Sequence, residues 1–380
     1  MVSVTIKQFL NLVERQFKTG TMKPVLGIGK GGIGKTEGIY NLTKKLGIGF
    51  KEIRLLLYSE VDLVGLPIID PKTGETNWAR NSLFPVAERD GEKGILVLDE
   101  ITSASINIRT AAYQLLDSKR SLGQYKLPDG WLVVGLGNGE EDGGNFQGLE
   151  GNLINRCSVY RVTPDLGAWK EWAAQNDVNP IVVAFLSFAP DMLHNYNPDI
   201  SAEQFASPRS WKALSDELNY NERIGKPFDP DDELLSIIAA GCVGDAAANK
   251  FVAFYAYRKS TIEPEDVLSG KAKMPYDVRD EVIHMAIQSS IKLFSDHFKV
   301  AKERGNIDKK VKMEMANLVK WVIELRKIKL DFAVLGINDL VASCDGFAEI
   351  AISDEFEEIC PEFTEFAMEQ SLLYDRDRSI

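Results

Sequence analysis

The sequence predicts an α/β protein in which a parallel sheet with helices on its faces is followed by mainly helical regions. Strand-length apolar stretches alternate with segments of helical spacing over the first 164 residues, and strand patterns become rare from about Asp165 onward. Such alternation is typical of a parallel sheet with helical crossovers. We therefore expect an α/β core over residues 1–164, a helical region over 165–258 and a mainly helical extension over 259–380.

The predicted core begins with a helical pattern at 6–17, a short strand at 24–28, a glycine-rich turn and a helix at 35–46. Three further apolar runs are too short for helices and rich in β-branched residues, which favours buried strands. They lie at 53–58, 95–98 and 131–136, with a helical pattern at 104–116 between the last two.

The spacing of apolar residues in the second half of the chain predicts amphipathic helices. We expect them at 169–175, 180–188, 208–219, 231–238, 246–257, 277–294 and 311–327, with a proline- and acid-containing stretch at 262–276. The final thirty residues are acidic but still carry Phe356, Phe363 and Phe366. Because these aromatic side chains favour burial, we predict a docked helix there.

Composition narrows the classes of function. A hydrophobic fraction of 44% and a charged fraction of 26% are ordinary for a globular protein, and the N-terminal stretch has Lys and Glu where a signal peptide would be apolar. Four scattered cysteines and three histidines argue against disulfides and zinc. We expect a cytoplasmic protein without a membrane segment.

The net charge of −12 disfavours nucleic acid as a partner, and we interpret the basic stretches at 44–54 and 300–312 as solvated helix faces.

The strongest motif is a phosphate-binding loop, GxxxxGK[ST], between the first core strand and its helix. Its residues are Gly29, Lys30, Gly31, Gly32, Ile33, Gly34, Lys35 and Thr36. Glycines let backbone N–H groups turn inward around phosphates, and the helix that follows adds its positive dipole end. Lys35 is expected to reach the β- and γ-phosphates of ATP, and Thr36 to offer a hydroxyl to Mg²⁺.

Polar residues follow two of the other predicted strands. The run ILVL ends in Asp99 and Glu100, which places Asp99 to hold Mg²⁺ and Glu100 to polarise an attacking water. Asn138 closes the strand VVGLGN, and in a parallel sheet it would lie beside Asp99. Arg156 in NLINRC and Arg209 in SPRSW are candidates to neutralise transition-state charge, because a guanidinium forks onto phosphate oxygens.

The order of these motifs resembles the AAA+ superfamily of ATPases, specifically its MoxR-like branch with the CbbQ and NorQ type proteins. The resemblance covers roughly residues 23–253, loosely to about Val341, and does not cover the last forty residues. One departure is Lys30, which adds a positive charge where many relatives have proline-containing loops. Further matching stretches are DLVGLP, LPDGWLVVGLGN, NLINRC, WKEWA, AFLSFAP and SPRSWKALS.

The resemblance implies a nucleotide site at a subunit interface, with Glu100 and Asp99 as Walker B, Asn138 as sensor 1 and Arg209 as sensor 2 in an α-helical lid. It implies Arg156 as an arginine finger acting in the neighbouring subunit, and hence a homo-oligomeric ring, usually a hexamer. Similar proteins are chaperone-like ATPases that remodel a partner, often one with a von Willebrand A domain. Segments around 66–78 and 118–130 look like the branch's two inserts, which face the pore or substrate.

Three other functions stay open. A nucleic-acid motor or loader is disfavoured by the acidic composition. A nucleotide-gated scaffold would bind ATP without turnover, which the set Glu100, Asn138 and Arg156 argues against. A small-molecule kinase is disfavoured because no separate acceptor-binding lid is evident and the second acid, Glu100, suits attack by water.

Overall fold

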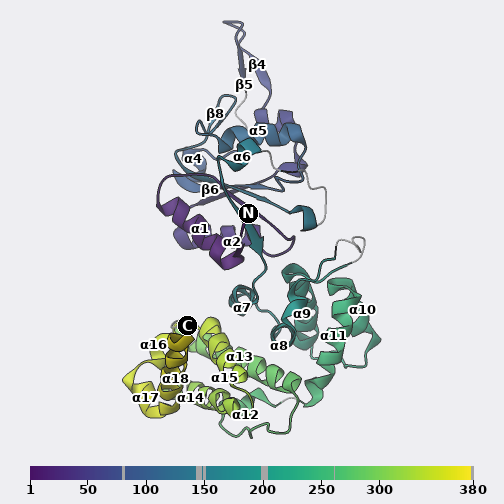
Figure 1. The fold of residues 1–380 in the computed structure, drawn as a ribbon, viewed down its shortest axis with the longest axis vertical. Helices are drawn as coiled ribbons and strands as arrows, with labels where there is room; N and C mark the ends of the chain where they lie inside the picture. The colour runs from purple at the N-terminus through teal and green to yellow at the C-terminus, as the bar shows by residue number, and fades with distance from the viewer. Residues whose placement is uncertain (79–81, 143–147, 149–150, 198–203, 261, 378–380) are drawn as a thin grey trace. The chain divides into compact units, whose positions relative to one another are not determined.

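We describe the protein from a computed structural model (Figure 1), which describes all residues except 79–81, 143–147, 149–150, 198–203, 261 and 378–380. The chain divides into two compact units. The first contains the residues up to Asp165 together with short later segments that include Ser207–Arg209, and the second contains most of the chain from Leu166 onward. The boundary between a lid and an extension at residue 258 stays a prediction.

The first unit is built on a six-stranded sheet in which every neighbouring pair of strands is parallel, which confirms the predicted fold class. Its order is β1-β10-β2-β9-β6-β3. The strands are β1 (Val2–Thr5), β2 (Val25–Gly29), β3 (Gly49–Arg54), β6 (Lys93–Asp99), β9 (Gly130–Gly137) and β10 (Ser158–Thr163). The two central strands β2 and β9 are almost fully buried, as their apolar runs predict.

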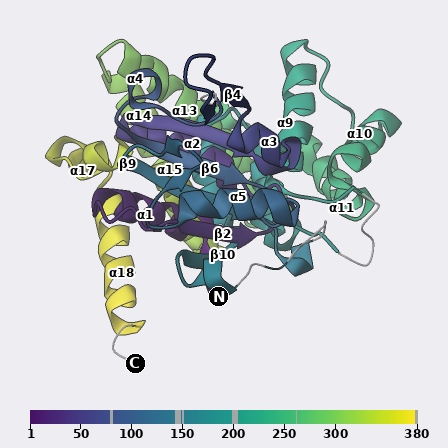
Figure 2. The same cartoon turned by 90° about the horizontal axis from the view of Figure 1, so that it is seen from above.

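Helices cover both faces of this sheet (Figure 1). α1 (Ile6–Lys18) and α2 (Lys35–Leu46) contact each other on one face, and Figure 2 shows α5 (Ile106–Leu116) lying over the strands on the other. Shorter helices are α3 (Glu60–Val64), α4 (Ala87–Asp90) and α6 (Gly151–Ile154). Two antiparallel hairpins lie where the sequence suggested inserts, β4–β5 (Pro67–Ile69 with Thr76–Trp78) and β7–β8 (Ser121–Leu122 with Tyr125–Lys126). The first projects from the unit (Figure 1), whereas the second packs on it through Leu122 and Tyr125.

The strand predicted at 53–58 is wrong. The strand there is β3, which ends at Arg54, and Leu55–Leu57 form a short 3₁₀ helix in which Leu56 and Leu57 are exposed. β3 lies at the edge of the sheet, so its half-buried polar residues are tolerated, and apolarity alone placed the strand too late. The strands β1 and β10 were not predicted, since neither is a continuous apolar run.

The second unit is helical, as predicted. Its first hydrophobic cluster centres on Phe185, Trp211 and Phe251, and its second joins the helices from α12 onward. The helices are α7 (Leu166–Gln175), α8 (Pro180–Phe188), α9 (Pro208–Arg223, whose first two residues belong to the first unit), α10 (Glu233–Val243), α11 (Asp245–Tyr255), α12 (Pro264–Leu268), α13 (Asp280–Glu303), α14 (Lys309–Glu324), α15 (Leu330–Ser343), α16 (Phe347–Ala351), α17 (Asp354–Ile359) and α18 (Pro361–Asp377).

The predicted docked helix at the acidic end is confirmed. Phe356 and Phe366 are almost fully buried, and the rings of Phe363 and Phe356 pack in a T-shaped arrangement. A buried ion pair connects helices of this unit: Lys170 Nζ on α7 lies 2.7 Å from Asp339 Oδ2 on α15. Within the described residues, none of the helices combines the length and the apolar character that crossing a membrane requires.

Candidate nucleotide site

The glycine-rich turn joins β2 to α2 and leaves the start of the helix open. Gly32 and Gly34 have φ of 75° and 86°, a left-handed conformation that strains other residues. Gly34 is the N-cap of α2, and as a glycine it has no side chain to accept hydrogen bonds from the first amides of the helix. The end of β2 is tightly packed, because a Cβ on Gly29 would lie 2.0 Å from the carbonyl oxygen of Val162.

Lys35 is folded back into this turn. Its Nζ donates hydrogen bonds to the carbonyl oxygens of Gly29 (2.6 Å) and Lys30 (2.8 Å), and the residue is 8% exposed. Burial lowers the pKa of Lys35 to about 8, although the carboxylate of Asp99 opposes the shift. The structure thus holds the ammonium group of Lys35 inside the loop, against its backbone carbonyls.

Thr36 and Asp99 meet across the site although they are 63 positions apart in the chain. Thr36 Oγ1 donates to Asp99 Oδ2 at 3.1 Å, and Asp99 Oδ1 accepts from the amide of Glu100 at 3.0 Å. A hydroxyl and a carboxylate are hard oxygen donors of the kind that Mg²⁺ takes alongside nucleotide phosphates and water. These two side chains therefore fit a Mg²⁺ ion.

Glu100 stands in an unusual backbone conformation directly after β6. Its φ is 57°, the left-handed region that few residues other than glycine adopt. The Ser103 hydroxyl donates to Glu100 Oε2 at 3.2 Å, and Ile101 returns to the sheet by donating its amide to the Leu136 carbonyl at 2.8 Å. Strain of this kind persists where the surroundings fix it and is common at functional sites.

Asn138 follows β9, which lies between β2 and β6 in the sheet. Its Oδ1 lies 3.9 Å from where a Cβ on Gly31 would stand, so the side chain faces the phosphate-binding turn. The structure also brings in Asp142, which the sequence analysis missed. Asp142 is buried, accepts a hydrogen bond from the amide of Gly139 at 2.8 Å, and its charge acts on Lys35. In the sequence, Asp142 stands out only as one of three acids after Asn138, and nothing there distinguishes it from Glu140 and Glu141.

Arg209 lies beside the turn of its own chain. Its amide donates to the Gly32 carbonyl at 3.3 Å, and its positive charge contributes to the lowered pKa of Lys35. The Ser207 hydroxyl lies 2.9 Å from where a Cβ on Gly32 would stand, which leaves room there for glycine alone. The start of α9 is therefore seated on the loop that would carry the phosphates.

Arg156 does not join the other candidates. It precedes β10, whose first residue, Ser158, pairs with Val25, whereas Val162 pairs with Gly29 at the phosphate-binding end. The four residue steps from Ser158 to Val162 span about 13 Å along the strand. At its own end of the sheet Arg156 Nη1 lies 3.4 Å from Asp117 Oδ2, with both side chains partly exposed.

Comparison with known proteins gives weak likenesses. No family model matches the chain. Solved structures that resemble it include a putative ATPase from Cytophaga hutchinsonii, with 14% identity over 96% of this chain and 90% of that one and a TM-score of 0.33. Hsp104 bound to ATPγS and FITC-casein gives 18% identity, 57% and 44% coverage and a TM-score of 0.40. A Thermotoga maritima RuvB mutant gives 12% identity over 86% of this chain and 83% of that one, with a TM-score of 0.33. At these identities and TM-scores the likenesses assign no activity to this chain.

Proposed function

We propose that the protein is a Mg²⁺-dependent ATPase of the AAA+ type. The observation that carries this proposal is the meeting of Thr36 and Asp99, at 3.1 Å, beside a buried Lys35 in a glycine turn at the open start of a helix. This arrangement supplies backbone N–H groups, an ammonium group and two oxygen donors within one small region. Together they suit a nucleoside triphosphate with its metal ion better than any single anion.

Each side chain then has a chemical task. Lys35 would exchange its two carbonyl acceptors for phosphate oxygens, and Glu100 would take the proton of the attacking water. Asn138 would orient that water, and Asp142 would hold the turn after Asn138 through the Gly139 amide. Arg209 would bind phosphate in its own subunit, because its backbone is hydrogen-bonded to the same turn. Mg²⁺, when bound, would neutralise charge on the β- and γ-phosphates.

We further propose that the protein works as a ring of the MoxR type, with Arg156 completing a neighbour's site. The register of β10 separates Arg156 from its own turn, so the arginine cannot reach its own nucleotide, and partial exposure leaves its guanidinium accessible. An arginine supplied by another subunit stabilises transition-state charge in related chemistry. A hexameric ring follows from the family resemblance.

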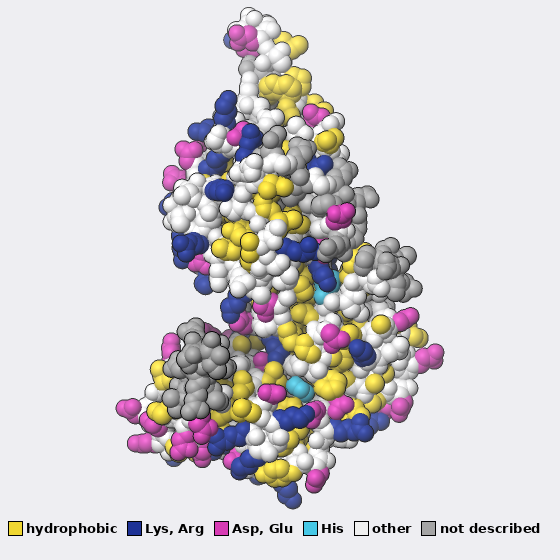
Figure 3. Space-filling view, in the orientation of Figure 1, with side chains coloured by type: hydrophobic (Ala, Val, Ile, Leu, Met, Phe, Trp, Pro, Cys, Tyr) yellow, Lys and Arg dark blue, Asp and Glu magenta, His cyan; other side chains and the backbone are white. Residues whose placement is uncertain are grey.

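The partner in this proposal is a client protein that the ring remodels, with a von Willebrand A domain as one candidate and the cytoplasm as the place. Leu66, Ile68, Ile69 and Trp78 on the β4–β5 hairpin are exposed, and Figure 3 shows apolar side chains along this projection. An exposed apolar patch on a projecting hairpin is a contact surface for a protein more than for a phosphate backbone.

Glu100→Gln tests the assignment of the base. The substitution keeps the size of the side chain but removes its proton affinity, so we expect ATP binding to persist while turnover falls at least about 100-fold. Glu140→Gln is the matched control, because Glu140 is an exposed acid in the short turn after β9. ATPase activity near the wild-type level in Glu100→Gln would remove Glu100 from the mechanism.

Mixed rings test the role of Arg156. Arg156→Ala and Lys35→Ala proteins are each expected to lack turnover, but a mixture should recover part of it, since a Lys35→Ala subunit still offers its arginine to a neighbour with an intact loop. Native mass spectrometry of differently tagged subunits would verify mixing. Full mixing without recovery would overturn the assignment in trans.

A further inference from the structure

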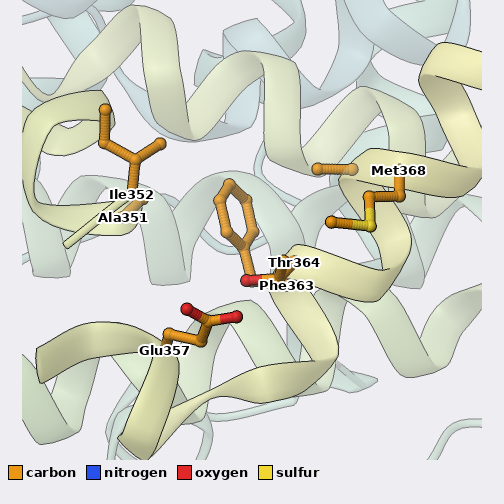
Figure 4. Close-up of a pocket in the computed structure, with 7 residues that line it drawn as sticks. Ala351, Ile352, Glu357, Phe363, Thr364 and Met368 are labelled. Atoms are coloured by element: carbon orange, nitrogen blue, oxygen red, sulfur yellow. The ribbon is translucent and has the colours of Figure 1, made fainter. Parts of the chain in front are cut away.

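The last three helices form an apolar groove beside the hydrophobic core of the second unit. The groove is about 330 Å³ and is lined by Ala351, Ile352, Glu357, Phe363, Thr364, Ala367 and Met368 from α16, α17 and α18. Figure 4 shows the Phe363 ring in the middle of these residues, with Ile352 and Met368 on opposite sides. Ile352 is 82% exposed and Met368 61% exposed.

Buried side chains of α17 and α18 anchor these helices to the core. Phe356, Cys360 and Phe366 point into the core, and each is at most 2% exposed. The ring of Phe363 packs in T-shaped arrangements with those of Phe347 and Phe356, at centroid distances of 6.1 and 6.3 Å. The groove therefore lies on helices that Phe356, Cys360 and Phe366 already anchor, and Ile352 in its wall stays largely exposed.

The stretch of chain that forms the groove is rich in negative charge. Seven of the sixteen residues from 354 to 369 are Asp or Glu, and the sequence has no Lys or Arg between Lys329 and Arg376. Three of the acids pair with basic residues on or after α14: Glu355 with Lys312, Glu362 with Lys320 and Glu369 with Arg326. Figure 3 shows acidic side chains gathered over α17.

Glu357, Glu358 and Glu365 are exposed acids of the same stretch. Among the residues that the structure describes, Glu357, Glu358 and Glu365 make no ion pair, and Glu357 is part of the groove wall. Unpaired carboxylates beside an apolar groove repel one another and attract a cationic ligand, which they would steer and orient. The combination selects for a ligand with one apolar and one basic face.

We propose that this groove docks a basic amphipathic helix of a partner protein. A hollow of about 330 Å³ has room for a few apolar side chains, which is what one helix face presents at positions i, i+3, i+4 and i+7. Lysines or arginines flanking that face would meet Glu357 in the groove wall and the acidic stretch of chain that contains it. A second copy of this chain fits less well, because a two-fold contact would bring the same acidic rim against itself. The proposal does not depend on the ATPase activity.

The test is fluorescence anisotropy on the full-length protein with a labelled peptide of about five helical turns, carrying leucines at helical spacing and lysines elsewhere. The comparison peptide has glutamate in place of every lysine. We expect saturable binding of the lysine peptide only, with an affinity that falls as NaCl rises from about 0.05 to 0.5 M. Ile352→Asp and Met368→Asp should each weaken binding about tenfold, and Glu357→Gln by a few fold.

The matched control is Ile237→Asp on α10, because Ile237 is 59% exposed and does not line the groove. It should bind like the wild type, and circular dichroism should show that all variants are folded. Equal binding of both peptides, equal affinity in the groove variants and the control, or no saturable binding would each overturn the proposal. So would concentration-dependent self-association that Ile352→Asp abolishes, since that would assign the groove to a second copy.

Discussion

ATP binding should be accompanied by proton uptake at Lys35. In the free protein its ammonium is buried against two carbonyl oxygens, which lowers its pKa to about 8. Bound phosphates would bring negative charge and charge-assisted hydrogen bonds to the same nitrogen, so its pKa should rise toward or above the ordinary value for lysine, about 10.4. Binding and protonation are then linked over the pH range between these two values.

The size of the effect follows from the two pKa values. At pH 8.5 a group of pKa about 8 is roughly one-quarter protonated, whereas one of pKa above 10 is almost fully protonated. Each ATP bound should therefore take up about 0.7 proton at pH 8.5. At pH 6.5 the free ammonium already holds its proton, so the uptake at Lys35 should be close to zero.

Isothermal titration calorimetry measures this uptake as the change in observed enthalpy between buffers of different ionisation enthalpy. Lys35→Arg is the control, because a guanidinium keeps its charge throughout this range and should show no uptake from this position. Wild-type protein that takes up no proton at pH 8.5, or the same uptake in Lys35→Arg, would refute the buried-ammonium account of the loop.

Three further predictions concern single positions. Asp339→Ala should lower the free energy of unfolding by about 3–5 kcal/mol, because it leaves Lys170 buried and unpaired; urea denaturation measures this, and a loss below about 1 kcal/mol would contradict it. Gly29→Ala should destabilise the fold by at least about 1–3 kcal/mol, because its Cβ would clash with β10. Gly31→Ala should keep the wild-type melting temperature and lose ATP affinity, since the nearest atom to its Cβ would be 3.9 Å away. Equal melting temperatures for the two variants would contradict this. Asp142→Asn should lower turnover with less effect on ATP binding, as measured by steady-state kinetics and titration, and an unchanged rate would exclude it from the site.

Sequence alone placed the parts of the site that local pattern determines. The phosphate-binding turn, and Asp99 at the end of a short buried strand, are set by residues within one strand–turn–helix segment, and the structure has them at the carboxyl edge of the sheet. The approach of Thr36 to Asp99 agrees with the expectation that both residues serve one Mg²⁺ ion.

Other features depend on contacts that no local pattern encodes. The hydrogen bond from Arg209 to Gly32 joins segments far apart in the chain, and the role of Asp142 rests on one amide in a loop of several acids. The strand wrongly placed at 53–58 shows the same limit, since edge position and not apolarity decides where β3 lies. The groove on α16–α18 is visible only once the buried side chains of these helices are known.

The most direct test of the account is titration of the purified protein with ATP, with Mg²⁺ present and with EDTA, for the wild type and for Asp99→Asn. If a triphosphate occupies the turn after β2 with its metal ion between Thr36 and Asp99, the wild type should bind ATP more tightly with Mg²⁺, and Asp99→Asn should lose most of that advantage. Absence of ATP binding by the wild type, or an equal advantage from Mg²⁺ in both proteins, would contradict it.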